Sequence, residues 1–144
     1  MAGRYFNWKL AIVLLIGLVV LGTTAFGLRK WQRSRRIEQG LVLGNKAYDE
    51  HRWEEAANQL GRYLGVMQDD VPTLLKYAES QLNIRPLKQS NVQQAIATYR
   101  NVLRLDQSNL KAAKPLSEMY LSMGMPGEAE LVVTRALQAG ESNN

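Results

Sequence analysis

Residues 43–56, "LGNKAYDEHRWEEA", gather the side chains of this chain that could do chemistry. They include the only histidine, one of three tryptophans and four carboxylates: His51, Trp53, Asp49, Glu50, Glu54 and Glu55. Imidazole and carboxylate groups can bind a metal ion or transfer protons. One histidine excludes a multi-histidine site, however, and no activated nucleophile lies within helical reach of it. The chain also lacks a glycine-rich phosphate loop, an H-E-x-x-H motif and a nucleophile elbow. We therefore expect no enzyme activity, no metal site and no cofactor.

The charge of the chain is divided unevenly along its length. It has no cysteine, which excludes disulfides, iron–sulfur clusters and thiolate zinc sites. The net charge is +5, but seven of the 18 Lys and Arg residues and none of the 13 Asp and Glu residues precede residue 37. The basic character therefore belongs to the N-terminal segment, and no nucleic-acid-binding motif accompanies it. We expect no nucleic-acid partner.

The N-terminal segment contains an apolar run at residues 10–28, "LAIVLLIGLVVLGTTAFGL", with no charged residue. A helix of this length is about 28 Å long, which matches the roughly 30 Å hydrocarbon core of a bilayer. We predict a short tail at 1–9, a single transmembrane helix at 10–28 and a basic juxtamembrane segment at 29–36. The residues predicted at the membrane interface are aromatic or basic: Trp8, Arg29, Lys30 and Trp31.

A cleaved signal peptide is the alternative interpretation of this run. Thr23 and Ala25 are small residues that could precede a cleavage site. The basic stretch "RKWQRSRR" at 29–36 favours an anchor, because positive charge directly after an export signal resists translocation. The same excess of positive charge predicts a single-pass membrane protein with its C-terminal part in the cytoplasm.

The residues after position 36 contain one pattern three times. The segments "EEAANQLGRYLGVM", "QQAIATYRNVLRLDQSN" and "GEAELVVTRALQAG" align on Ala56, Ala95 and Ala129, at spacings of 39 and 34 residues. A second segment precedes each of them, with apolar residues at i, i+3, i+4 and i+7, and nothing is typical of a strand. Each unit is predicted to be helix, turn, helix.

This pattern resembles the tetratricopeptide repeat (TPR). Small residues are expected where the two helices of a unit cross, and a large apolar residue precedes each: Leu43–Gly44, Tyr77–Ala78 and Leu116–Ser117. The resemblance implies an all-α fold, with one N-terminal transmembrane helix followed by a three-repeat α-solenoid over 37–140. Its repeats are placed at about 37–70, 71–109 and 110–140, with a tail at 141–144. Pro115 lies inside a first helix, which it is expected to kink or to delay.

The resemblance also implies a partner-binding groove lined by the first helix of each unit, on the concave face of the array. The groove is expected to bind a protein or peptide, so the function expected is a membrane-tethered interaction scaffold or assembly factor. An accessory single-pass subunit of a larger membrane complex and an exported TPR protein are the alternatives. The predicted groove residues are Leu41, Asn45, Tyr48, Asp49, Leu75, Glu79, Leu82, Lys111, Lys114, Glu118 and Leu121.

The last predicted helix, at about 128–139, is followed by no capping helix in this sequence. Arrays of this kind usually end in a polar helix that covers the final apolar face. This helix instead has several large apolar residues: Leu131, Val132, Val133 and Leu137. Either this face contacts a partner or a second copy, or the sequence is the front part of a longer array; we expect the face to be an interaction surface.

Overall fold

The computed structural model describes residues 38–142, which fall in the compact unit Ile37–Asn144. Over that range no helix is both long enough and apolar enough to cross a bilayer. The expected transmembrane helix at 10–28 lies outside the described residues. So do the interface residues Trp8, Arg29, Lys30 and Trp31.

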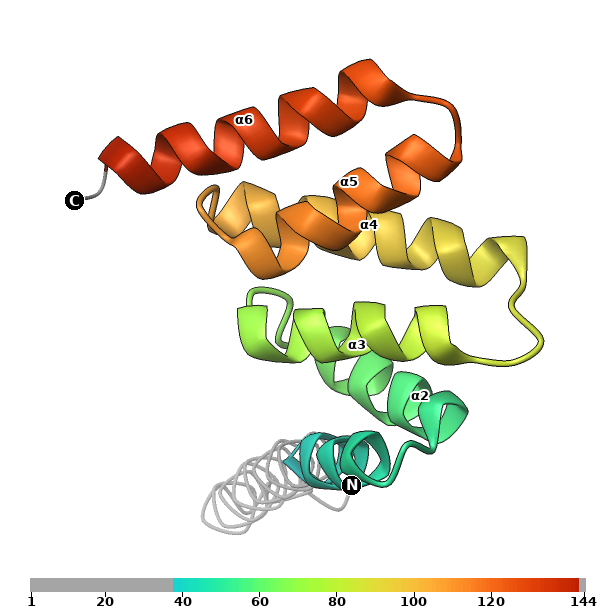
Figure 1. The fold of residues 1–144 in the computed structure, drawn as a ribbon. Coiled ribbons are helices and arrows are strands. Elements are labelled where there is room, and N and C mark those ends of the chain that lie inside the picture. The colour runs from blue at the N-terminus through green and yellow to red at the C-terminus, as the bar shows by residue number, and fades with distance from the viewer. Residues whose placement is uncertain (1–37, 143–144) are drawn as a thin grey trace, which may run out of the picture. The chain divides into compact units, whose positions relative to one another are not determined.

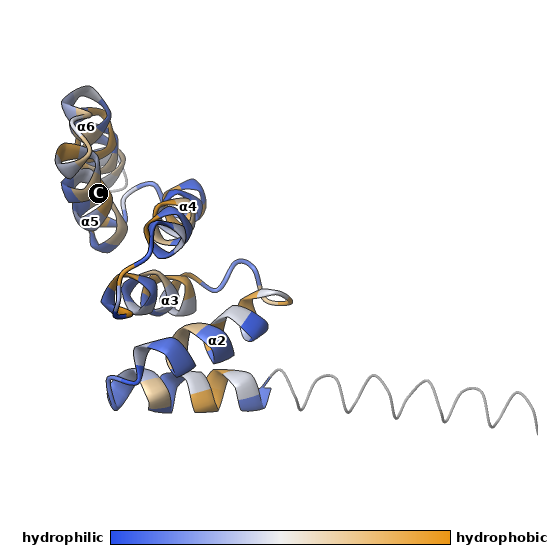
Figure 2. Ribbon diagram, turned by 90° about the vertical axis from the view of Figure 1, so that its right-hand side faces the viewer, coloured by the Kyte–Doolittle hydropathy of each residue, from blue (hydrophilic) through white to orange (hydrophobic). Residues whose placement is uncertain are grey.

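The described part is built from helices that pack in chain order (Figure 1). Residues 38–49 are helical and are followed by α2 (Trp53–Leu64), α3 (Val71–Asn83), α4 (Gln89–Leu105), α5 (Leu110–Ser122) and α6 (Pro126–Ser142). Hydrophilic and hydrophobic residues alternate along these helices, as expected when each has one buried side (Figure 2). The three helix–turn–helix units expected from the sequence are therefore present, and the fold is a TPR-like helical array.

Local sequence signals explain where the helices begin and end. The Asp70 carboxylate accepts hydrogen bonds from the backbone N–H and the hydroxyl of Thr73, at 3.3 and 2.8 Å, and so caps α3. Asn109 caps α5 in the same way, by accepting from the backbone N–H of Ala112 at 3.2 Å. Gly124 separates α5 from α6 with a φ of 73°, which glycine adopts without steric cost. These caps keep the connections between helices short.

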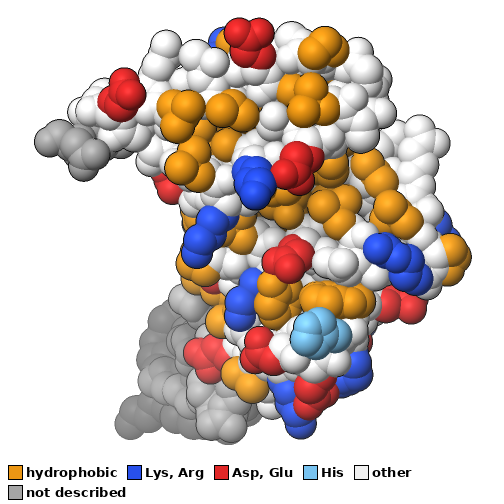
Figure 3. Space-filling view, in the orientation of Figure 1, with side chains coloured by type: hydrophobic (Ala, Val, Ile, Leu, Met, Phe, Trp, Pro, Cys, Tyr) orange, Lys and Arg blue, Asp and Glu red, His pale blue; other side chains and the backbone are white. Residues whose placement is uncertain are grey.

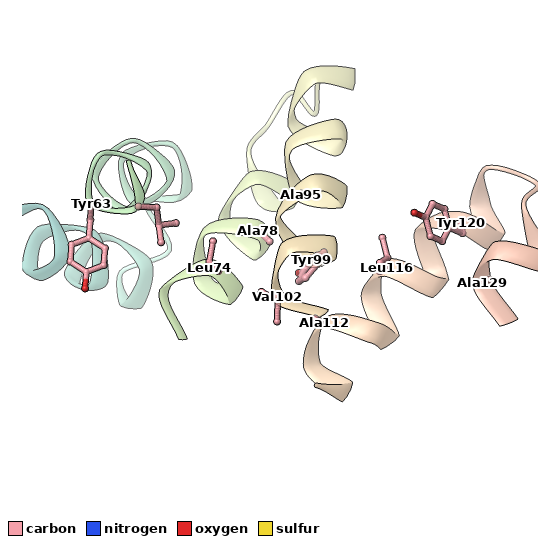
Figure 4. Packing of buried hydrophobic residues seen from close by; sticks show 11 residues of the cluster. Tyr63, Leu74, Ala78, Ala95, Tyr99, Val102, Ala112, Leu116, Tyr120 and Ala129 are labelled. Atoms are coloured by element: carbon pink, nitrogen blue, oxygen red, sulfur yellow. The ribbon is translucent and has the colours of Figure 1, made fainter. Parts of the chain in front are cut away.

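The core depends on small residues at the helix crossings (Figure 4). Ala56, Ala95 and Ala129 are all 2 % exposed or less, as the repeat pattern predicts. A Cβ atom at Gly44 would lie 2.5 Å from Cδ2 of Leu60, so this crossing has no room for any side chain. Close approach of the helix axes therefore depends on these positions.

Three details differ from the sequence predictions. α6 runs from Pro126 to Ser142, so it is longer than the 128–139 expected and continues past the predicted domain end at 140. Pro115 does not delay α5, because that helix begins at Leu110, directly after its cap. Leu43 is 46 % exposed, whereas the equivalent Leu116 is 1 % exposed. The first unit has no described helix before it to cover Leu43.

Candidate partner-binding groove

Two adjoining hollows lie along the face formed by the first helices of the three units. One has a volume of about 770 Å³ and extends from Tyr48 across α3 to the start of α5. The other, of about 400 Å³, continues along α5. They share four residues: Leu75, Glu79, Leu110 and Lys111. We call their union the concave groove, and Figure 3 shows apolar side chains among lysines and carboxylates on the face that α3 and α5 present.

The first and second repeats are joined across this groove by side-chain bonds. The Tyr48 hydroxyl donates to Oε2 of Glu79 at 2.5 Å, and Nζ of Lys76 donates to Oδ1 of Asn45 at 2.7 Å. Nζ of Lys76 also lies 5.2 Å from the centre of the Tyr48 ring, within range of a cation–π contact. Burial and, next, the bond to Glu79 raise the pKa of Tyr48, so its hydroxyl stays protonated and remains a donor. One wall of the groove is therefore held in place before any partner arrives.

The opposite wall offers basic groups with no such bonds. Lys111 and Lys114 on α5 are exposed, and neither forms an ion pair within residues 38–142. Between them and α3 lies an apolar floor that includes Leu75, the half-exposed Leu110 and the buried Tyr99. Burial, followed by the charge of Glu79, raises the pKa of Tyr99 to about 12. The groove can therefore take apolar side chains on its floor and acceptor groups at its α5 wall.

The structure brings together only part of the predicted set. Five predicted residues line the concave groove: Tyr48, Leu75, Glu79, Lys111 and Lys114. Asn45 adjoins the groove through Lys76, while Leu41 and Leu82 pack against the hydrophobic core. The other three, Asp49, Glu118 and Leu121, are exposed and do not line the two hollows.

Nine lining residues were not among the predicted groove residues: Val71, Pro72, Lys76, Tyr99, Asp106, Ser108, Asn109, Leu110 and Pro115. Tyr99 belongs to the second helix of its unit, whereas the groove residues were predicted only from first helices. The groove position of Lys76 follows from its bond to a side chain 31 residues away, for which a single sequence contains no signal.

Residues 43–56, the stretch rich in His, Trp and carboxylates, contain the turn between the two helices of the first repeat. Arg52 bonds the carboxylates of Glu50 and Glu55. The His51 ring packs edge-on against Trp53, with ring centres 5.0 Å apart. Among the described residues no group of three or more His, Cys, Asp or Glu side chains could hold a metal ion. Trp53 therefore packs over the turn, against both His51 and Tyr48.

The comparisons with known proteins bear on the fold. No protein-family model matches the chain, and no curated protein matches it. A solved structure described as MamA MSR-1 C2 matches with a TM-score of 0.62 and 19 % sequence identity. The match covers 100 % of this chain and 83 % of that one. The chain is therefore similar in fold to a TPR-containing protein.

Proposed function

We propose that this chain is a membrane-tethered scaffold or assembly factor that binds a segment of a partner protein in its concave groove. The observation that carries the proposal is the groove itself, in which an apolar floor is flanked by a wall with fixed bonds and a wall with free lysines. Extended or helical segments bind such surfaces through a few apolar anchors and several polar contacts. The fold similarity supports a protein-binding function, since arrays of this type display exposed concave faces.

The tether is proposed from the sequence. The apolar run at 10–28 has the length of a membrane span, and the bases at 29–36 favour retention over cleavage. A tether restricts the groove to partners at or near one membrane surface, which raises their effective concentration. We propose that the repeats lie in the cytoplasm, from the same distribution of charge.

The C-terminal face is proposed as a second contact surface. On α6, Leu131 and Leu137 are 43 % and 50 % exposed, and only Ala129 and Ala136 are buried. Covering these leucines would remove apolar surface from water, which favours association. This observation favours the second candidate function, an accessory subunit of a membrane complex, if the contact is permanent.

The groove is tested by copurification of the full chain from membranes in a mild detergent. Leu75→Arg, which places a charge on the apolar floor, is compared with Arg62→Glu at an exposed position near the C-terminal end of α2. Partners that Leu75→Arg loses and Arg62→Glu retains support the groove. An unchanged set of partners in both variants contradicts it.

The stoichiometry and the tether have separate readouts. Exchangeable partners at less than one per chain indicate a scaffold, whereas a fixed stoichiometric complex indicates a subunit. For the tether, the chain should resist alkaline extraction from membranes. Protease added outside intact cells should reach the repeats only after the membrane has been permeabilised. Release at alkaline pH would refute the anchor.

A further inference from the structure

A larger hollow lies between α4 and α6, and the concave groove does not include it. It has a volume of about 890 Å³ and is bounded by the C-terminal halves of both helices and the turn that joins α4 to α5. We call it the arginine groove, because Arg100 and Arg104 line it from α4 and Arg135 lines it from α6. Three guanidinium groups from two helices thus border one hollow.

Two of these three arginines have no acidic partner among residues 38–142. Within residues 38–142 neither Arg100 nor Arg135 forms an ion pair. Arg104 bonds the Asn101 side chain at 2.8 Å and lies 3.8 Å from the exposed Asp69 carboxylate. From Ile37 onward the chain has 11 bases against 13 acids, so an excess of arginine at one place is a local feature.

Asp106, the one acidic residue that lines the arginine groove, already accepts hydrogen bonds from its neighbours. The carboxylate of Asp106 accepts hydrogen bonds from the hydroxyl of Ser108 and the amide of Asn109, both at 2.9 Å. Gln107 and Gln138 add neutral amide groups to the lining. The free charged groups of the arginine groove are therefore all hydrogen-bond donors.

The residues at equivalent positions of the preceding repeat show whether the fold needs these arginines. When the units are aligned on Ala56, Ala95 and Ala129, the equivalents of Arg100 and Arg104 in the preceding repeat are Gly61 and Gly65. The equivalent of Arg135 is Asn101. The preceding pair of second helices, α2 and α4, thus has small or neutral residues at these three positions. The repeat pattern therefore does not require an arginine at each of them.

Helix-end electrostatics explain only one of the three. Arg104 lies in the last turn of α4, where a positive charge complements the helix dipole. Arg100 lies a full turn earlier, and Arg135 lies seven residues before the end of α6 at Ser142. The dipole effect falls off within one turn, so it does not account for Arg100 and Arg135.

We propose that the arginine groove binds an acidic segment of a partner protein, through carboxylates that pair with Arg100 and Arg135. Guanidinium groups form paired hydrogen bonds with carboxylates and phosphates alike. The hollow is far larger than one phosphate ion, and its arginines are spread along two helices rather than gathered at one point. Leu103 and Ala139 contribute apolar surface between them. These features suit an extended chain with several acidic side chains.

Binding of a fluorescein-labelled octapeptide of alternating Asp and Ala to the full chain, in neutral detergent, tests the proposal by fluorescence anisotropy. We expect Arg100→Gln with Arg135→Gln to weaken binding by about fivefold or more, and added salt to weaken binding to the unmodified chain. The control Arg62→Gln removes an exposed arginine elsewhere and should have no effect. An equal affinity in the double variant would overturn the proposal.

Two further arms identify the source of the anion. Lys111→Gln alters the concave groove, so loss of peptide binding in that variant alone would assign the peptide to that groove and overturn the present proposal. Inorganic triphosphate and nanodiscs that contain phosphatidylserine are added as competitors of the peptide. If either displaces the peptide at an equal or lower concentration of anionic groups, an acidic protein segment is not the preferred ligand and the proposal is overturned. An octapeptide of alternating Asn and Ala should not bind.

Discussion

The two ends of the helical array differ at positions that are equivalent in the repeat. Within the array, the third and tenth residues of the second unit, Thr73 and Ser80, are buried. Their equivalents at the N-terminal end, Gln39 and Lys46, are polar and exposed. At the C-terminal end, a position that is buried inside the array keeps its apolar residue. Leu137 is 50 % exposed where its equivalent Leu64, covered within the array, is 9 % exposed.

This difference shows which end gains from contact. Exposed Gln39 and Lys46 already interact well with water, so covering them brings little free energy and requires Lys46 to lose hydration. Covering Leu137 and its neighbours removes apolar surface from water, at about 25 cal/mol per Å². The N-terminal end also exposes Val42 and Leu43, at 66 % and 46 %, but it combines them with these polar residues. We therefore expect association to be favoured more at the C-terminal face, and the predictions below test that contrast.

The largest effect is expected when a junction residue inside the array is truncated. Leu60 is fully buried, and Leu60→Ala should lower the free energy of unfolding by about 2–5 kcal/mol, because it leaves a cavity. The equivalent Val133 on α6 is only partly buried, so Val133→Ala should cost less than about 1 kcal/mol. Urea denaturation followed by circular dichroism measures both. A similar loss of stability in both variants would show that the C-terminal helix packs as tightly as the interior of the array.

A second contrast uses glycines. Gly44→Ala should destabilise the first unit by about 1–3 kcal/mol, because the new methyl group meets the immobile Leu60. Gly127 on α6 has no atom within 4 Å of such a methyl group, so Gly127→Ala should be neutral or stabilise by up to about 1 kcal/mol. Thermal melting of the two variants side by side gives the sign of each change. A stable Gly44→Ala variant would contradict the close helix approach.

A third change tests association directly. Leu137→Asp places a charge on the C-terminal face and should weaken self-association of the full chain by about tenfold, since a buried unpaired charge opposes contact. Leu43→Asp is the matched change at the N-terminal end, where Leu43 is 46 % exposed beside the polar Gln39 and Lys46, and it should weaken association less than Leu137→Asp does. Sedimentation velocity over a range of concentrations in detergent is the measurement. A chain that stays monomeric throughout would remove self-association from the proposed function.

The smallest effect concerns the turn between α4 and α5. Hydrogen bonds from Asn109 and then Ser108 lower the pKa of Asp106 below its usual value of 3.8. A lowered pKa in the folded state stabilises the fold above about pH 4, and that contribution is lost as the pH falls through the folded pKa. Asp106→Asn should therefore lower stability slightly at pH 7 and flatten its fall below pH 4. An unchanged acid limb in pH-dependent melting curves would contradict this role.

The sequence predicts the fold because the fold depends on local and periodic features. Ala56, Ala95 and Ala129 recur at nearly constant spacing, and each is buried at a helix crossing. The partner groove was predicted less completely. Its wall depends on bonds between side chains 31 residues apart, Tyr48 with Glu79 and Asn45 with Lys76. Such pairs depend on side-chain placement in three dimensions, so the pattern could not distinguish Asn45 or Tyr48 from Leu41, which packs on the core.

The position of the turn between α4 and α5 limits where residues can be inserted into this chain. Asp106 borders both the concave groove and the arginine groove, so residues 106–109 separate the two surfaces for which binding is proposed. An insertion there would alter both surfaces at once. The connection between α3 and α4, at residues 84–88, already carries the five extra residues of the second repeat. A reporter domain or epitope is therefore best placed at 84–88, where the chain tolerates added length, and not at 106–109.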